Sequence, residues 1–278
     1  LDGPATKTTR TLDWDGSDSL RVDLPAVAHY RPGSGDTVSL SGDAEILNRV
    51  RVRRGRIEMD CRLSDRGRQI EITLPGREFS EFTASSNAHI ILEGLHQNKL
   101  DLSLEGGGSM EASGDVDDSE VSVGGSGEAR LARLNIRRLE LSIAGGGQAD
   151  VAPTDRAEIS ISGSGTARIP APVKALQKLE VSIAGSGKVE GGGNADDLEI
   201  SIAGSGDARL GSLNVKRADL SIAGSGDADI APTERAEINI MGSGNVRLYA
   251  EPRSIESNIA GSGHVERVAR QTGSMPRE

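Results

Sequence analysis

The sequence predicts an all-β fold, a right-handed parallel β-helix of about ten rungs that follows an irregular N-terminal β region. A short glycine motif recurs at intervals of 18 to 22 residues, and the third residue after each motif alternates in charge. Neighbouring strands of a sheet lie about 4.8 Å apart, so stacked repeats with alternating charges place each acid between two bases. One repeat is therefore one turn of a solenoid. Parallel crossovers favour the right-handed form.

The charge ladder is the set of alternating residues that follow the motifs. The nine motifs begin at Gly106, Gly125, Gly145, Gly163, Gly185, Gly204, Gly224, Gly242 and Gly261, and the ladder consists of Glu111, Arg130, Asp150, Arg168, Glu190, Arg209, Asp229, Arg247 and Glu266. A slip by one rung would bring like charges together, so we expect the ladder to fix which rung stacks on which. A tenth, degenerate rung is expected at residues 82–90, where the best alignment with residues 222–230 puts His89 in the ladder.

Each rung is expected to contain two strands of alternating polarity on either side of its glycine turn. Residues 139–143 are typical, with apolar side chains inward and polar ones outward. Pro153, Pro170, Pro172, Pro232 and Pro252 are expected in the connections between rungs, where a missing N–H disrupts no ladder. The expected boundaries are 1–75 for the N-terminal β cap region, 76–268 for the β-helix and 269–278 for a C-terminal tail.

A longer repeat is superimposed on the rungs. Residues 128–165 and 207–244 are identical at 25 of 38 positions without a gap. A block of four rungs was therefore duplicated, and because four is an even number the duplication preserves the alternation of charge.

The glycine motifs are interpreted as structural turns. Nucleotide-binding glycine loops need a following helix whose N-terminus receives the phosphate, and here a strand pattern follows each motif. The calcium-binding nonapeptide needs Asp two residues after its last glycine, where this chain has Ala, as at Ala129 and Ala208. We therefore expect glycine where the turn needs a positive φ or where stacked backbones approach closely.

Composition excludes several classes of protein. With 2% aromatic residues and 36 glycines the core is expected to be thin, and a net charge of −10 argues against nucleic acid as a partner. The single cysteine, Cys61, excludes an internal disulfide and a Cys-rich zinc site, and it is expected to be a small buried apolar residue.

No apolar run is long enough to span a membrane. Because the chain begins at Leu1, we expect that a preceding segment was removed, and a cleaved signal peptide would fit.

Two charged columns are predicted on the outer surface. The acid column is Asp101, Glu120, Glu140, Glu158, Glu180, Glu199, Asp219, Glu237 and Glu256; the basic column, two residues earlier on the same strands, is Lys99, Arg138, Arg156, Lys178, Arg217 and Arg235, interrupted by Asp118 and Asp197. Stacked carboxylates repel one another unless they are neutralised. The basic column is the simpler source of neutralisation, so no cofactor is expected. Calcium is the alternative, with Asp118 and Asp197 as its favoured neighbourhood.

The candidate binding face is a column of hydroxyl and amide side chains on the same strands, the serine face. It consists of Ser142, Ser160, Ser182, Ser201, Ser221 and Asn239. Such a column presents a flat polar surface to a glycan or to another protein, and the alternative is a face that contacts only solvent.

No catalytic centre is expected. The histidines at 29, 89, 96 and 264 have no metal-ligand spacing, and no nucleophile elbow is present. Three classes of function remain: a non-catalytic binding surface, an assembly module that stacks end to end through exposed strand edges, and a carbohydrate-active β-helix enzyme, which the fold alone permits.

The repeated Ser-Ile-Ala-Gly-Ser-Gly-Asp-Ala units, together with Trp14-Asp15-Gly16 and the stretch Ile72–Gly76, resemble the bacterial family known as putative auto-transporter adhesin head GIN domain, also called DUF2807. The likeness covers most of the chain. It implies a parallel β-helix exported to the periplasm or cell surface, so we expect an extracytoplasmic protein in the periplasm, in the outer membrane or secreted. From the flat repeated faces we expect a glycan or another envelope protein as partner. The family offers no established binding residues to carry across.

Overall fold

The computed structural model describes residues 7–16, 18–60, 70–170 and 175–268, which form two compact units, 1–153 and 154–278. The fold is 77% strand and 2% helix, and it is a β-solenoid of about nine turns, which confirms the predicted fold class. Cys61, Pro172 and the expected tail 269–278 lie outside the described residues.

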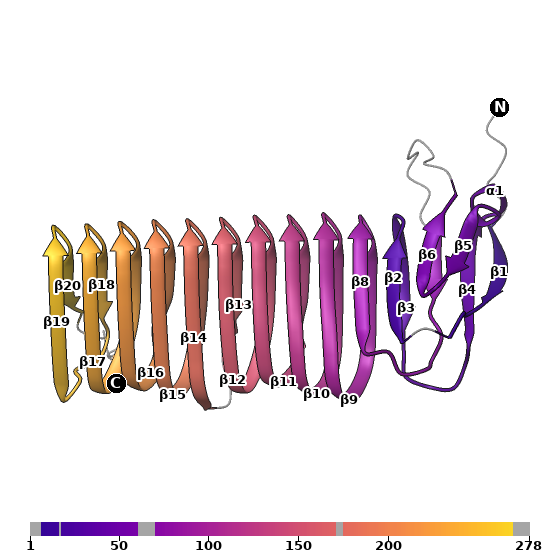
Figure 1. Ribbon diagram of the computed structural model, residues 1–278. Coiled ribbons are helices and arrows are strands. Elements are labelled where there is room, and N and C mark those ends of the chain that lie inside the picture. The colour runs from indigo at the N-terminus through magenta and orange to yellow at the C-terminus, as the bar shows by residue number, and fades with distance from the viewer. Residues whose placement is uncertain (1–6, 17, 61–69, 171–174, 269–278) are drawn as a thin grey trace, which may run out of the picture. The chain divides into compact units, whose positions relative to one another are not determined.

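The first unit begins with short strands of mixed direction (Figure 1). They are β1 (Lys7–Asp13), β2 (Ser19–Asp23), β3 (Ala26–Tyr30), β4 (Thr37–Asp43), β5 (Val50–Arg53), β6 (Arg56–Met59) and β7 (Ile70–Thr73), with the helix α1 (Ala44–Leu47) between β4 and β5. β4 pairs antiparallel with β1 and β7, and β5 and β6 form an antiparallel hairpin. This mixture is the irregular N-terminal β region that the sequence predicts.

Two of these early strands already belong to the stack of rungs. β2 pairs in parallel with β8 (Glu81–Ser86), and β3 pairs in parallel with the first residues of β9 (His89–Gly106). The sequence does not reveal this first rung, because β4 to β7 and α1 are inserted between β3 and β8 and remove the regular interval. The domain boundaries given above stay a prediction.

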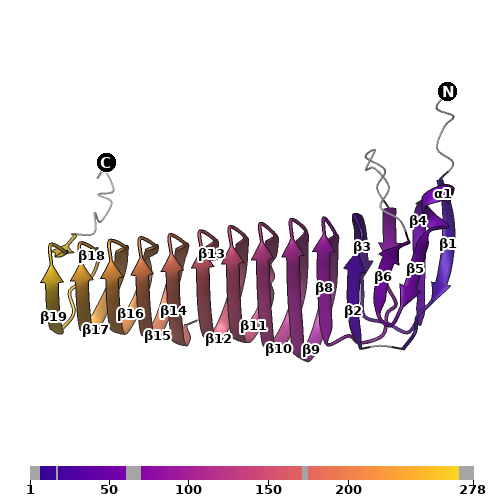
Figure 2. The same ribbon diagram turned by 45° about the horizontal axis from the view of Figure 1, so that its top comes forward.

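Regular parallel rungs follow, with registers that match the glycine spacing. In the first unit β9 pairs with β10 (Ser109–Gly125), and β10 with β11 (Glu128–Gly145). β12 (Gln148–Gly163) contains the boundary between the units. The later strands are β13 (Thr166–Ile169), β14 (Leu176–Gly185), β15 (Lys188–Gly204), β16 (Asp207–Gly224), β17 (Asp227–Gly242), β18 (Asn245–Leu248), β19 (Ser254–Gly261) and β20 (His264–Arg267). Figure 2 shows that β14 to β17 and β19 end at the same edge, where the glycine turns follow.

The expectation of two separate strands per rung is wrong for most rungs. β9, β10, β11, β12, β15, β16 and β17 are single strands of 16 to 18 residues that run from one glycine turn to the next. Consequently Pro153 lies inside β12 and Pro232 inside β17, not in connections. Pro232 sits where the register between β16 and β17 shifts, and the Thr233 hydroxyl donates to the Val215 carbonyl at 3.0 Å. Pro232 has no N–H to donate, and the hydroxyl of the next residue, Thr233, provides a hydrogen bond to the carbonyl of the neighbouring strand.

The core is thin and aliphatic along the regular rungs. Its inward side chains are Leu, Ile, Val and Ala, as at Leu141, Ile143, Ile222 and Ala228, each at most 1% exposed. Aromatic rings are concentrated in the first unit, where Trp14, Tyr30, Phe79 and Phe82 form a cluster with ring centroids 5.0 to 5.8 Å apart. This cluster contains four of the five aromatic residues of the chain.

Both expected reasons for the glycines apply, and the first glycine of a motif such as Gly224 meets both of them. The first glycine of each motif has a positive φ, for example +122° at Gly204 and +132° at Gly224. A Cβ on the last glycine of a motif would meet the rung before it, since at Gly206 it would come within 2.5 Å of Ile183 Cγ2. The first glycine needs a left-handed backbone and also the absence of a side chain, and the last needs only the absence of a side chain.

The predicted place of His89 in the charge ladder is wrong by two residues. Ser86 pairs with Gly106 and Ile91 pairs with Glu111, so Ile91 occupies the ladder position of this rung. Ser86 takes the place of a glycine and has a φ of +58°. A slip of two residues leaves side chains on the same face of a strand, so polarity alone could not detect it.

Candidate functional site

The charge ladder is in register within each unit. Glu111 pairs with Arg130 in the first unit, and in the second the order is Arg168, Glu190, Arg209, Asp229, Arg247, Glu266 on neighbouring strands. Asp150 lies on β12. Ion pairs join Arg130 Nη1 to Glu111 Oε1 at 2.9 Å and Arg247 Nη1 to Asp229 Oδ1 at 3.2 Å. Glu190 lies between two arginines, 3.5 Å from Arg168 Nε and 3.6 Å from Arg209 Nη1.

We expect the ladder to stabilise the stacking register, which Arg209 can test. Arg209→Glu places like charges on three successive rungs, whereas Arg209→Ala only removes attractions. The Glu variant should lose about 0.5 to 1.5 kcal/mol more unfolding free energy than the Ala variant, a small value because the side chain is half exposed. Thermal unfolding of both variants at low and high salt measures this difference in stability, and high salt should reduce the difference. Equal losses in the two variants at low salt would contradict a role in register.

The acid and basic columns also stack in register. Glu81 extends the acid column, since it pairs with Asp101. Lys178 Nζ lies 2.9 Å from Glu180 and 3.0 Å from Glu199, and its hydrogen bonds to both carboxylates raise the pKa of Lys178. Lys99 contacts Asp101 at 3.0 Å. Basic side chains thus neutralise part of the acid column, as the sequence suggested.

The two aspartates that interrupt the basic column are held by arginines. Arg217 donates from Nε and Nη2 to the two Asp197 oxygens at 2.6 and 2.9 Å, and Arg138 makes the same paired contact with Asp118. These hydrogen bonds lower the pKa of both carboxyls, so each stays ionised and paired at a lower pH than an unpaired aspartate would. Their oxygens are therefore engaged, and among the described residues no group of three His, Cys, Asp or Glu side chains has a geometry that could hold a metal ion.

The serine face forms a continuous exposed column in the second unit. Ser160, Ser182, Ser201, Ser221 and Asn239 pair in that order on β12, β14, β15, β16 and β17, and all five are exposed. Ser142 is also exposed, and it pairs with Ser122 in the first unit. Two residues further along the strands lies a column of exposed small residues, Ala184, Ala203 and Ala223. Short side chains on both columns give a flat surface along β14, β15 and β16, and on β17 Met241 follows in the second column.

A basic hairpin in the first unit is a feature that the sequence prediction missed. β5 and β6 carry Arg51, Arg53 and Arg56, and the turn between them carries Arg54. Five of the eight residues from Arg49 to Arg56 are arginine, and none is acidic. This run was the available signal, and the net charge of the whole chain obscured it.

Comparisons with known proteins give a family and a fold. The model of the family described as putative auto-transporter adhesin, head GIN domain (DUF2807) matches residues 18–171 and 171–252. Two solved structures of proteins described as putative adhesins are similar. That from Parabacteroides distasonis has 19% identity and a TM-score of 0.56, covering 96% of this chain and 98% of its own; that from Parabacteroides merdae has 18% identity and a TM-score of 0.54, covering 97% and 99%.

At these identities the two structures show a common fold only. No curated protein matches the chain. Within the described part of the chain, no helix has the length and apolar character needed to cross a membrane.

Proposed function

Because the chain belongs to the family of putative auto-transporter adhesin head GIN domains, we propose that it is a non-catalytic, extracytoplasmic surface protein that binds a glycan or another envelope protein. The serine face is the proposed contact surface. The adhesin description of the family supports a role at a surface, and the narrower assignment of a partner rests on the geometry of the rungs.

The observation that carries this proposal is the unbroken register from Ser160 to Asn239. Five exposed hydroxyl or amide groups follow one another at the spacing of strands, about 4.8 Å. In the column beside it Ala184, Ala203 and Ala223 are short, whereas Met241 is large and 62% exposed. A long partner can therefore approach the hydroxyls most closely over Ser182, Ser201 and Ser221. An extended polymer would gain a similar small contact from each rung, which suits binding better than chemistry at a single point.

The test is loss of hydroxyls in steps. Ser182→Ala, Ser201→Ala and Ser221→Ala should each weaken retention on bacterial cells or glycan arrays less than about threefold, and the triple variant should weaken it about tenfold or more. The matched control is Ser186, Ser205 and Ser225, which are exposed serines in the turns of the same rungs. The same triple change to Ala there should leave retention unchanged.

Three results would contradict the proposal. If the two triple variants weakened retention equally, the serine face would not be the contact surface. Absence of retention on every surface would favour the assembly role, in which rungs stack end to end. Conversion of uronate polymers to unsaturated products, if one point mutation abolished it, would favour the enzyme alternative.

A further inference from the structure

The basic hairpin has a well-defined charged face. Alternate residues of its strands point inward, and Val50 and Ile57 are fully buried. The other face carries Arg51 and Arg53 on β5 and Arg56 and Glu58 on β6. The turn is fixed, since the Gly55 N–H donates to both carboxylate oxygens of Asp15 at 2.8 Å and the Gly55 carbonyl accepts from the Arg21 N–H at 2.8 Å. The charged face is therefore held on a rigid support.

Three arginines lie in a row across neighbouring strands of this face. Arg53 pairs with Arg56 in the hairpin, and Arg56 pairs with Arg21 of β2. Like charges directly opposite each other destabilise a sheet. The Arg21 guanidinium is compensated by Glu105, with contacts of 3.2 and 2.5 Å. The other two arginines have no comparable partner.

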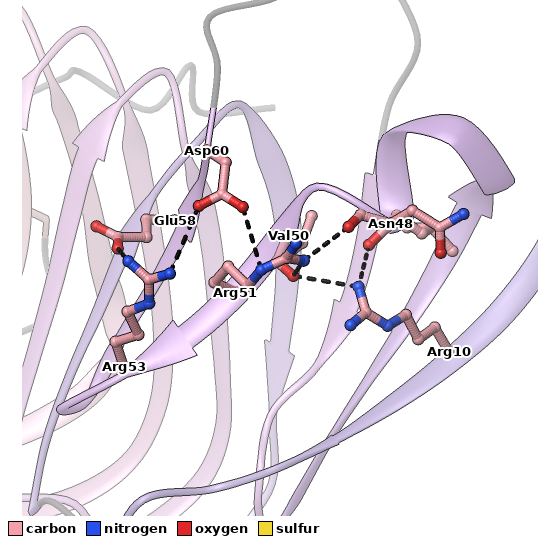
Figure 3. A network of polar contacts seen from close by, with 8 residues as sticks. Arg10, Asn48, Val50, Arg51, Arg53, Glu58 and Asp60 are labelled. Atoms are coloured by element: carbon pink, nitrogen blue, oxygen red, sulfur yellow. Dashed lines mark hydrogen bonds and ion pairs between the residues drawn. The ribbon is translucent and has the colours of Figure 1, made fainter.

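The donors of the hairpin arginines are only partly used (Figure 3). Arg51 Nε lies 3.1 Å from Asp60, and Arg51 Nη1 donates to the Asn48 carbonyl at 2.6 Å and to the Val50 carbonyl at 3.0 Å. Arg53 approaches Glu58 and Asp60 only to 3.8 Å, and Arg56 approaches Asp23 and Glu58 to 3.8 and 3.9 Å. These distances are too long for hydrogen bonds.

Two further arginines flank this row. Within residues 7–16, 18–60, 70–170 and 175–268, the exposed guanidinium groups of Arg49 and Arg54 make no hydrogen bond or ion pair. Each guanidinium has five N–H donors in a fork that fits a carboxylate. The hairpin and its flank thus offer four arginines whose guanidinium groups donate no hydrogen bond to a described residue, and two of them, Arg53 and Arg56, lie in long ion pairs with carboxylates.

We propose that this basic hairpin binds the carboxylate groups of an acidic polysaccharide. Arginine forks recognise carboxylates through paired hydrogen bonds, and a row of them suits a polymer that repeats its charge. Met241 and Ile259 are the exposed large apolar residues of the described chain, and neither belongs to the first unit, so the hairpin has no large apolar side chain to insert into a membrane. The overall negative charge disfavours nucleic acid, whose charge density is higher.

This inference goes beyond the proposed function, because the surface differs from the serine face and each can fail separately. The probe is polygalacturonate at low salt, with dextran as the neutral polymer. Arg53→Gln with Arg56→Gln should weaken the Kd roughly tenfold or more, since charged hydrogen bonds are lost. The Lys double variant at these positions should bind with intermediate affinity, because charge remains without the fork.

The matched control is Arg133→Gln with Arg253→Gln. These exposed arginines make no ion pair with any described residue, and their loss changes the net charge equally. Its Kd should equal that of the unmodified protein. Thermal unfolding should show at most a small loss for the hairpin variant, because the repulsion between Arg53 and Arg56 offsets their long ion pairs with Glu58, Asp60 and Asp23. This measurement separates a binding defect from misfolding.

Four results would overturn the proposal: no binding of polygalacturonate, equal binding of dextran, equal weakening in the control variant, or tighter binding of phosphatidylglycerol vesicles or double-stranded DNA at the same concentration of negative charge. Loss of polygalacturonate binding in the serine triple variant with no effect of the hairpin variant would assign the polymer to the serine face instead.

Discussion

Gly224→Ala is expected to destabilise the second unit by about 2 to 5 kcal/mol, one of the two largest effects on stability. Gly224 has a φ of +132°, and a Cβ there would lie 2.3 Å from the Gly204 carbonyl oxygen of the rung before it. A left-handed backbone costs an L residue about 1 to 2 kcal/mol, and overpacking adds about 1 to 3. Urea unfolding of the variant measures the loss.

Two other glycines separate these contributions. Gly16 has a φ of +86° with no atom within 4 Å of its virtual Cβ, and Gly33 has neither a positive φ nor a close neighbour. Gly16→Ala should cost about 1 to 2 kcal/mol and Gly33→Ala less than about 0.5. A loss at Gly224 no larger than that at Gly16 would show that close stacking of backbones does not restrict the motif.

Phe79→Ala is expected to destabilise the first unit by about 3 to 5 kcal/mol. Phe79 is fully buried, and its ring packs edge-on against Trp14, Tyr30 and Phe82 at centroid distances of 5.3, 5.8 and 5.5 Å. The aliphatic core of the rungs is thin, so this cluster supplies much of the bulky packing near the first rung. Equilibrium unfolding followed by Trp14 fluorescence measures the change.

Tyr249→Ala is the matched control for Phe79. Tyr249 is the remaining aromatic residue, it is only half buried, and it belongs to the second unit. Its truncation should cost about 1 to 2 kcal/mol, because less apolar area is lost from the interior. Similar losses of unfolding free energy at Phe79 and Tyr249 would show that the aromatic cluster does not stabilise the N-terminal region more than a single half-buried ring does.

The sequence by itself determined the repeating part of the molecule. The glycine interval and the alternating charge specify contacts between residues 18 to 22 positions apart, and the registers of Glu190 with Arg209 and of Ser201 with Ser221 are those that the interval predicts. The same interval placed the acid column, the basic column and the serine face. Every regular rung carries the same glycine motif and ladder position, so the sequence specifies the register independently at each rung.

Only the tertiary structure decided the features that lack this repetition. The first rung, from β2 and β3, is separated from β8 by inserted strands, so no interval marks it. The displacement of His89 by two residues preserves its face and leaves the polarity pattern unchanged. Pro232 within β17 lies where the register with β16 shifts, and that shift depends on the neighbouring strand.

The row of Arg21, Arg56 and Arg53 shows the same limit at a candidate site. The arginine run from 49 to 56 is visible in the sequence, but Arg21 joins it only because β2 pairs with β6. Which donors remain free depends on where Glu58, Asp60 and Glu105 lie in space. Local periodicity fixes contacts between repeats of the same pattern, whereas contacts between unlike segments depend on how the chain folds back on itself.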